Sequence, residues 1–274
     1  MKRTTLSMWA VLAAVVVLGL GISLLPAQNV VGLGTSYAPY DNFHAPFLDP
    51  SRWSLYGACW TWNVLECVRE IQNNSLRLEV KSFGATNSND GIGYGFDELH
   101  FANPAPIRRI AARLTVRRAS ADACSANTGT QSGQSLIVGT FFNSGSGDPN
   151  DDVQAFLDIE HYAGDPPGQL DALGFLYWEG QFFGGVDLGH PSVGETLIAQ
   201  LIWDQPNHQF VVSWTDANTG KMTQAFMPYS MPDLMQAAAP DRFLAVRTFA
   251  PNCVGACMKS VFVETRFYNV WIGK

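Results

Sequence analysis

Extended runs of residues recur along this chain roughly every 8 to 14 residues, separated by segments rich in Gly, Pro, Asn and Asp. This spacing, without alternating long helical segments, is typical of antiparallel β-sandwiches and barrels. Charged residues make up only 15% of the chain, and it holds 25 glycines and 15 prolines, which suits a turn-rich β protein. We therefore predict an all-β fold, with one or two helical turns only at residues 233–239. The predicted strands are residues 67–71, 75–83, 91–101, 107–118, 134–143, 153–162, 170–179, 181–187, 194–204, 210–215, 222–227, 243–249 and 261–272.

The run at residues 153–162 alternates most clearly. Because successive side chains on a strand point to opposite faces, one face carries only apolar residues, namely Val153, Ala155, Leu157 and Ile159. The other face mixes amide, aromatic and acidic side chains: Gln154, Phe156, Asp158, Glu160 and Tyr162. Such a strand covers a core with one face, and its other face either meets solvent or lines a polar groove. Two aromatic residues, and two acids only two positions apart, favour the groove.

The N-terminal segment has the composition of a targeting sequence. Lys2 and Arg3 precede an almost entirely apolar run at residues 8–25, and residues 26–28 resemble a cleavage region. We interpret residues 1–27 as a secretory signal peptide. The apolar run is also long enough to span a bilayer, so an uncleaved N-terminal membrane anchor is the alternative. Both interpretations predict a secreted or extracytoplasmic chain, with a linker at residues 28–36 and one domain at residues 37–274.

The exported part is acidic. Without Lys2 and Arg3, 15 basic residues remain against 24 acidic ones, a formal net charge of about −9. Nucleic acids and anionic lipid surfaces are polyanions that an acidic domain repels. We therefore expect no nucleic-acid partner, and membrane contact only through an N-terminal anchor.

The cysteines fit disulfide bonds in an exported chain. There are five, at Cys59, Cys67, Cys124, Cys253 and Cys257. Cys59 with Cys67, and Cys253 with Cys257, are close enough in sequence to close local loops, which would leave Cys124 over. The spacing alone does not fix the connectivity. A zinc site is not indicated, because no Cys-x-x-Cys or paired-histidine motif accompanies the cysteines.

Residues 144–152 form a turn-rich segment that contains Asp148, Asp151 and Asp152. Hard cations bind clustered oxygen atoms, so a structural calcium ion is one interpretation. The Asp-x-Asp-x-Asp-Gly spacing of a calcium loop is absent, however. We expect a plain turn here and no cofactor, with structural calcium as the alternative.

Four segments together resemble the concanavalin A-like lectin/glucanase domains. They are Asp41-Asn42-Phe43, Leu48-Asp49-Pro50-Ser51-Arg52-Trp53, Asn74-Ser75-Leu76-Arg77-Leu78 and, at the end of the chain, Phe267-Tyr268-Asn269-Val270-Trp271-Ile272. The resemblance spans nearly the whole exported chain. It implies a jelly-roll β-sandwich of two curved antiparallel sheets, with a carbohydrate groove on the concave face.

Within that superfamily, this chain is most similar to the laminarinase- and lichenase-like glucanases. Their groove strand carries Glu-x-Asp-x-Glu or Glu-x-Asp-x-x-Glu, in which the first Glu is the nucleophile and the last is the acid/base. Here Asp158 and Glu160 match the second and third members, while Phe156 stands at the nucleophile position. A phenyl ring cannot form a glycosyl-enzyme bond, so the resemblance implies binding without retaining hydrolysis. Tyr268 similarly stands where the family often has an acidic calcium ligand.

The acid pair also has properties that follow from the strand alone. Asp158 and Glu160 share a face, with Cα atoms roughly 6.5–7 Å apart, and such proximity raises the pKa of one of them. Carboxylates roughly 6.5–9.5 Å apart can serve an inverting hydrolase, which keeps a divergent glycoside hydrolase as an alternative. Because both acids lie opposite the apolar face, we expect that replacing either with alanine opens no core cavity.

Aromatic rings stack on pyranose faces, and acids or arginines bind the hydroxyl groups. We predict a carbohydrate-binding site made of Phe156, Asp158, Glu160, Tyr162, Tyr177 and Glu179. Tyr177 and Glu179 are expected to share a face of the next strand, and Arg247 or Arg266 to pair with the acids or lie at the surface. The favoured function is an exported, lectin-like domain that binds a polysaccharide or other glycan. A glycoside hydrolase using Asp158 and Glu160, and a structural or adhesion sandwich without a sugar ligand, are the alternatives.

Overall fold

The computed structural model describes residues 36–274, except residues 55, 62–63, 86–91, 126–130 and 255–257. The predicted signal peptide, and all but residue 36 of the predicted linker, lie outside the described residues. Gly34–Lys274 form one compact unit. Among the described residues, no helix is long and apolar enough to cross a membrane.

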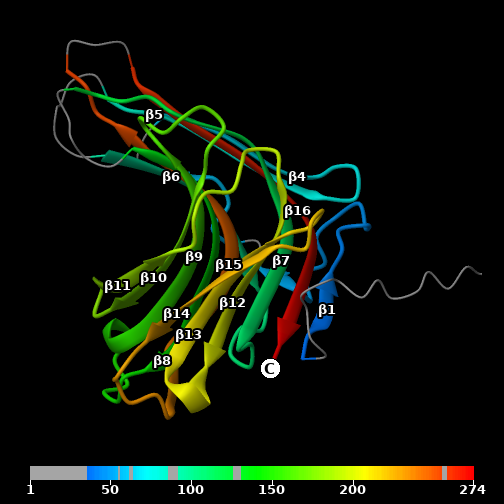
Figure 1. The fold of residues 1–274 in the computed structure, drawn as a ribbon, viewed down its shortest axis with the longest axis vertical. Coiled ribbons are helices and arrows are strands. Elements are labelled where there is room, and N and C mark those ends of the chain that lie inside the picture. The colour runs from blue at the N-terminus through cyan, green and yellow to red at the C-terminus, as the bar shows by residue number, and fades with distance from the viewer. Residues whose placement is uncertain (1–35, 55, 62–63, 86–91, 126–130, 255–257) are drawn as a thin grey trace, which may run out of the picture. The chain divides into compact units, whose positions relative to one another are not determined.

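The unit is a jelly-roll β-sandwich of two curved antiparallel sheets, as predicted (Figure 1). The back sheet contains, in spatial order, β14 (Met222–Pro228), β13 (Gln209–Asp216), β12 (Thr196–Asp204), β7 (Arg109–Ala121), β16 (Ser260–Gly273), β5 (Leu76–Phe83) and β4 (Val64–Ile71), with β1 (Ala38–Asp41) paired to β16. The front sheet contains β11 (Gln181–Asp187), β10 (Asp171–Trp178), β9 (Asp152–Tyr162), β8 (Ser132–Asn143), β15 (Met235–Pro251), β6 (Ile92–Phe101) and β2 (Trp53–Ser54), with β3 (Trp60–Thr61) paired to β6. The described residues also include two short 3₁₀ helices, η1 (Pro149–Asp151) and η2 (Gln205–Asn207).

The alternation of side chains decides which face of each strand enters the core. In β5, Leu76, Leu78 and Val80 are fully buried, while the intervening Arg77 and Glu79 lie on the outer face of the back sheet. Val153, Ala155, Leu157 and Ile159 of β9 enter the same core from the front sheet, as the sequence predicts. Their burial removes apolar surface from water, which stabilises the sandwich by about 25 cal/mol per Å².

Every predicted strand overlaps a strand of the structure, and the short strands β1, β2 and β3 were not predicted. A tight turn joins β4 and β5, the strands predicted at residues 67–71 and 75–83, into a hairpin. Asn73 and Asn74 both have positive φ, at 54° and 56°, and the Gln72 N–H donates to the Ser75 carbonyl at 2.9 Å. Two consecutive positive φ values match the twist of the flanking strands, and asparagine adopts them at lower cost than most residues.

The prediction of helical turns at residues 233–239 is wrong, because β15 begins at Met235. The backbone N–H groups of Ala238 and Ala239 donate to the Asp152 carboxylate, each at 2.8 Å. Met235 also pairs with Asn143 of β8. Contacts with a distant strand therefore override the helical propensity of an alanine-rich segment.

Within the described residues, two disulfide bonds link segments of the unit. Cys59–Cys67 joins the segment before β3 to β4, and Cys124–Cys253 joins residues 129 positions apart. The local Cys59–Cys67 pairing is as the sequence suggested. The suggested pairing of Cys253 with Cys257 is wrong, because Cys124 lies with its Cα 6.1 Å from that of Cys253. Cys257 lies outside the described residues.

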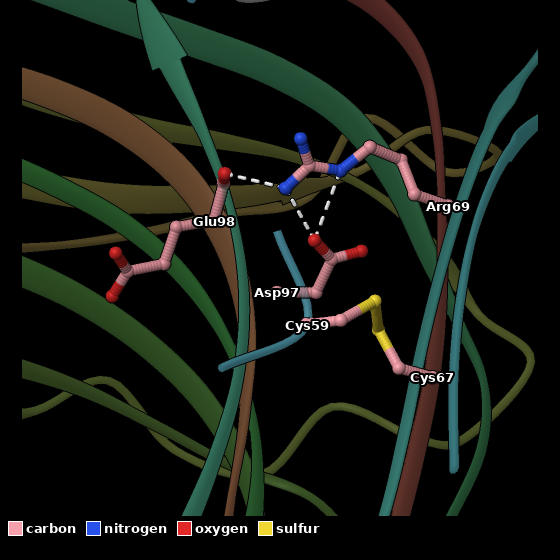
Figure 2. The surroundings of a disulfide bond; sticks show 5 residues. All are labelled: Cys59, Cys67, Arg69, Asp97 and Glu98. Carbon is pink, nitrogen blue, oxygen red and sulfur yellow. Dashed lines mark hydrogen bonds and ion pairs between the residues drawn. A yellow bond between two sulfur atoms is a disulfide. The ribbon is translucent and has the colours of Figure 1, made fainter. Parts of the chain in front are cut away.

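A buried ion pair joins the two sheets beside the first disulfide (Figure 2). Arg69 on β4 donates through Nε to Asp97 Oδ1 on β6 at 2.9 Å, and its Nη2 contacts the same oxygen and the Glu98 carbonyl. Asp97 is fully buried, and burial outweighs the charge of Arg69 and raises the pKa of Asp97. Removing Arg69 would therefore leave an uncompensated acid in the core.

The two disulfides are expected to differ in their contribution to stability. In the chain-entropy model, closing the Cys59–Cys67 loop is worth about 2–3 kcal/mol and closing the Cys124–Cys253 loop about 5 kcal/mol. Replacing both cysteines of each bridge with alanine should therefore lower Tm more for Cys124 and Cys253, at about 2–4 °C per kcal/mol. Thermal unfolding followed by circular dichroism measures the order, and mass mapping without reduction checks the pairing. A larger loss from the Cys59–Cys67 pair would contradict the prediction.

Candidate functional site

Strand β9 lies between β8 and β10 inside the front sheet, so its outward side chains stand away from the sheet edges. Its core face carries the four predicted apolar residues, and its outer face carries Gln154, Phe156, Asp158, Glu160 and Tyr162. The two faces are therefore assigned as the sequence predicts. Neighbouring outward side chains come from β8, β10, β15 and β6.

The outer face of the front sheet holds a pocket of about 430 Å³, which we call the β9 pocket. Strands β6, β9, β10 and β15 contribute Tyr94, Gln154, Phe156, Tyr177, Arg247 and Phe249 to its lining. The volume lies within the usual range of small-ligand sites, roughly 300–1,000 Å³. Two of the predicted site residues, Phe156 and Tyr177, thus meet in one pocket.

Aromatic pairs stand on two sides of the β9 pocket. Phe156 and Tyr177 meet edge to face with ring centroids 5.1 Å apart, and Tyr94 and Phe249 meet edge to face at 4.8 Å. The guanidinium of Arg247 lies 4.7 Å from the Phe249 ring centroid. The pocket therefore combines flat apolar surfaces with one cation.

A chain of hydrogen bonds holds the cation in place. Arg247 Nε donates to Gln134 Oε1 at 2.6 Å, and Gln134 Nε2 donates to Glu160 Oε2 at 2.7 Å. The Tyr162 hydroxyl donates to the other oxygen of Glu160. Gln134 is the direct cross-strand partner of both Arg247 and Glu160, so the sheet register itself creates this network.

Asp158 and Glu160 are on the predicted face but are not exposed there, with 1% and 0% of their surface accessible. Leu136 of β8 lies beside Asp158, and it forms a small apolar cluster with Val138 and Ala245 on this outer face. The expectation that either acid can be truncated without opening a cavity is therefore wrong. Loss of the Glu160 carboxylate would also remove the partner of Gln134 and Tyr162.

Burial changes the acid–base properties of this pair. It raises the pKa of Asp158 well above its usual range, and the charge of Glu160 raises it further, against the opposing charge of Arg247. Burial also raises the pKa of Glu160, although its hydrogen bonds to Gln134 and Tyr162 oppose the shift. No side chain among the described residues hydrogen-bonds either oxygen of Asp158. Burial without a side-chain partner therefore disfavours the charged form of Asp158.

The remaining predicted residues differ in their placement. Tyr162 is partly buried on the outer face, where burial and the adjacent Glu160 raise the pKa of its phenol. Glu179 does not share a strand face with Tyr177, because β10 ends at Trp178. Glu179 and Gly180 form a two-residue turn with φ of 52° and 68° between the paired Trp178 and Gln181. Glu179 is exposed at that turn.

Sequence reasoning missed the pocket residues on the far side of β9. Tyr94 belongs to an alternating series in the predicted strand 91–101, so its outward direction was predictable, but its proximity to Phe249 was not. Of the two arginines weighed as partners for the acids, Arg247 lies near them. Arg266 lies on the back sheet, where it donates to Gln72 at 2.7 Å.

The aspartates of residues 144–152 are engaged by the chain itself. Asp148 caps η1 by accepting from the Asn150 N–H at 2.9 Å, and Asp152 is buried and accepts from Asn143, Ala238 and Ala239. Among the described residues, the one group of three metal-ligand types is Cys59, Cys67 and Asp97, and its two sulfurs form a disulfide. Residues 149–151 of this turn-rich segment form η1, and structural calcium stays a prediction.

Neither a protein-family model nor a curated protein sequence matches this chain. Solved structures with a similar fold include the κ-carrageenase of Pseudoalteromonas carrageenovora, at 10% identity and a TM-score of 0.44, covering 92% of this chain and 100% of that one. The GlcNAcα1-4Gal-releasing endo-β-galactosidase of Clostridium perfringens has 11% identity and a TM-score of 0.44. That similarity covers 90% of this chain but only 65% of the galactosidase. The basic winged bean lectin has 12% identity and a TM-score of 0.37, and the similarity covers 78% of this chain and 98% of the lectin. These similarities assign no activity, so we infer function from the residues of this chain.

The buried acid predicts a specific pH dependence of stability. Because the folded-state pKa of Asp158 is raised, its proton is retained on folding but lost from the unfolded chain above about pH 4. Its contribution therefore lowers the free energy of unfolding as pH rises from about 4 towards the folded-state pKa. Asp158→Asn removes this contribution, so its Tm relative to the native protein should rise between pH 4 and pH 8.

We expect the Tm of Asp158→Asn to gain steadily on that of the native protein over this range, because the asparagine amide does not titrate. Glu179→Gln, which changes an exposed carboxylate in the β10–β11 turn, is the matched control and should follow the native pH profile. Thermal melts at closely spaced pH values provide the measurement. If the Tm of Asp158→Asn and that of the native protein changed in parallel with pH, the pKa of Asp158 would not be raised in the folded protein.

Proposed function

We propose that this chain is an exported, lectin-like domain that binds carbohydrate without cleaving it. The observation that carries the proposal is the β9 pocket, which is lined by two aromatic pairs and by Arg247, whose guanidinium lies over the Phe249 ring. Aromatic faces offer stacking surface to pyranose rings, and Arg247 and Gln154 offer donors to hydroxyl or acidic groups. The hydrogen bond to Gln134 holds Arg247 in place before a ligand arrives, which lowers the entropic cost of binding.

The finer family relation belongs to the same proposal. Phe156 occupies the position that the laminarinase- and lichenase-like glucanases give to their nucleophile, and here its ring packs on Tyr177 in the pocket wall. A ring at that position adds contact surface and excludes water. We propose that Phe156, in place of the nucleophilic Glu, leaves a strand that binds carbohydrate but does not cleave it.

The predicted export of the chain fits its chemistry. Two disulfides are stable in an oxidising compartment, which supports a secreted or extracytoplasmic location for the single domain at residues 37–274. The partner we propose is a polysaccharide or other glycan. The acidic net charge argues against nucleic acid, and an N-terminal anchor would supply any membrane attachment.

Binding should depend on the pocket wall and on its cation. Phe249→Ala and Tyr177→Ala should each weaken glycan binding by about 2–10-fold, in line with the worth of one aromatic contact. Arg247→Gln should weaken it by about 10–100-fold, because charge-assisted hydrogen bonds are lost. Glycan-array screening followed by calorimetry with the glycan found measures these changes. Phe47→Ala, which removes an exposed ring outside the pocket, is the control and should bind normally.

A glycoside hydrolase using Asp158 and Glu160 is the second candidate, and their raised pKa values are the observation that favours it. Acid–base catalysis needs such values near neutral pH. Both side chains are closed off from solvent, however, and neither lines the β9 pocket. The third candidate, a structural or adhesion sandwich, would bind no glycan on the array.

Catalysis can be tested apart from binding. We expect the native protein to release no reducing sugar from β-1,3-glucan, mixed-linkage glucan, agar or carrageenan, because Phe156 removes the covalent route. Phe156→Glu would restore the Glu-x-Asp-x-Glu order but should lower stability by about 1–3 kcal/mol, since it adds a third acid beside two buried ones. Reducing-end assays and the anomeric configuration of any product, followed by NMR, make the measurement. Cleavage by the native chain with a trapped glycosyl adduct would favour the hydrolase.

A further inference from the structure

A second pocket lies on the outer face of the front sheet, next to β6 and away from β10 and β11. We call it the β6 pocket; its volume is about 330 Å³, and its lining residues are Tyr56, Gly57, Ala58, Trp60, Phe96 and Glu98. It shares no lining residue with the β9 pocket. The proposed glycan site therefore leaves it unexplained.

Three aromatic rings line the β6 pocket. Trp60 stacks on Phe96 with ring centroids 5.2 Å apart and planes inclined by 17°. Tyr56 meets the imidazole of His100 at 5.5 Å. Tyr56 and Trp60 are 77% and 48% exposed, although large aromatic side chains are costly to leave in water. Such exposed rings around a concave site indicate a ligand surface.

The loop that carries these rings is fixed to the sheet. The Glu98 N–H donates to the Gly57 carbonyl at 3.0 Å, and the Cys59–Cys67 disulfide ties the loop to β4. Gly57 has φ of 80°, and a Cβ there would lie 2.9 Å from His100 Nε2. Glycine thus lets the loop backbone pack directly onto His100 and Glu98. The pocket is built before any ligand binds.

The charge at the floor of the pocket is negative. His100 contacts Asp241 through Nδ1 at 2.9 Å and Glu98 through Nε2 at 3.2 Å. Burial alone would lower the pKa of His100, but the hydrogen bonds to Asp241 and Glu98 outweigh it and raise that pKa to about 9. His100 is therefore a cation at neutral pH, shared between two carboxylates. His100, Asp241 and Glu98 together therefore carry a net charge of about −1.

No other cation of the described residues neutralises Glu98. Arg69 contacts only its backbone carbonyl and binds Asp97 on the opposite face of β6, and Figure 2 shows the Glu98 carboxylate directed away from that guanidinium. Arg247, across from Phe96 on β15, donates to Gln134 on β8. Arg242, next to Asp241, is buried and donates to the carbonyls of residues 107, 140 and 241. Glu98 Oε1 has no hydrogen-bond partner in the described part of the chain.

We propose that the β6 pocket binds a small organic cation of the quaternary or methylated ammonium class. Its methyl groups would contact Tyr56, Trp60 and Phe96, and its charge would lie opposite Glu98. Aromatic faces attract cations through their quadrupole, and an alkylated ammonium is weakly hydrated and enters such a cage at low desolvation cost. A carboxylate at the floor excludes anions, and the rings favour an alkylated cation over a metal ion.

Choline and its neutral analogue 3,3-dimethylbutan-1-ol separate the role of charge from that of shape, because both carry the same three methyl groups. We expect choline and tetramethylammonium to saturate the full-length protein in calorimetric titration and in tryptophan fluorescence. Choline should bind at least fivefold more tightly than the neutral alcohol. Glu98→Gln and Trp60→Leu should each weaken choline binding by about tenfold.

The matched controls are Glu66→Gln, an exposed acid on β4, and Phe47→Ala, an exposed ring outside both pockets. Both should bind choline as the native protein does, and so should Tyr177→Ala of the β9 pocket. Far-ultraviolet circular dichroism and Tm check that each variant is folded, and Trp60→Leu still decides the outcome if Glu98→Gln does not fold. Equal affinity for the alcohol, no saturable binding of choline, or displacement of choline by a glycan bound at the β9 pocket would each overturn the proposal.

Discussion

The two-residue period of β9 is the constraint on which the rest of the structure depends. The strand pairs over almost its whole length with β8 and β10, so its register is fixed on both sides. A slip by one residue would turn Asp158 and Glu160 into the core and Leu157 and Ile159 out of it. The buried apolar face therefore decides which residues can line the outer pocket. Fold and candidate site are set by the same alternation.

The same register gives the acids their environment. Gln134 and Leu136 of β8 lie beside Glu160 and Asp158, and Arg247 of β15 lies beside Gln134. Glu160 thereby receives a hydrogen bond from the Gln134 amide, whereas Asp158 lies beside the alkyl side chain of Leu136. Burial and the charge of Glu160 raise the pKa of Asp158, against the opposing charge of Arg247. The register therefore places one guanidinium beside two buried acids whose charged forms burial disfavours.

Three features were predictable because each depends on residues within a few positions of one another. They are the alternation of β9, the turn between β4 and β5, and the choice of which strand face enters the core. The burial of Asp158 was not predictable, because it depends on Leu136 and on the outer-face cluster of distant strands. Glu179 was predicted to lie on a strand face, but β10 ends at Trp178 and Glu179 has a positive φ in the turn that follows. The Cys124–Cys253 pairing and the extended segment at Met235 likewise depend on contacts between residues far apart in sequence.

The two pockets contain charged groups of opposite sign, and a row of aromatic rings connects them. Phe249 of the β9 pocket contacts Tyr94, Tyr94 stacks on Phe96 at 5.9 Å, and Phe96 stacks on Trp60 of the β6 pocket. A substitution in the middle of this row would disturb the walls of both pockets, because each ring supports the next. Substitutions at Tyr177 and Trp60 act on opposite sides of the face and affect one pocket each. Independent losses at these two positions therefore indicate two sites, whereas a shared loss indicates one continuous ligand across the row.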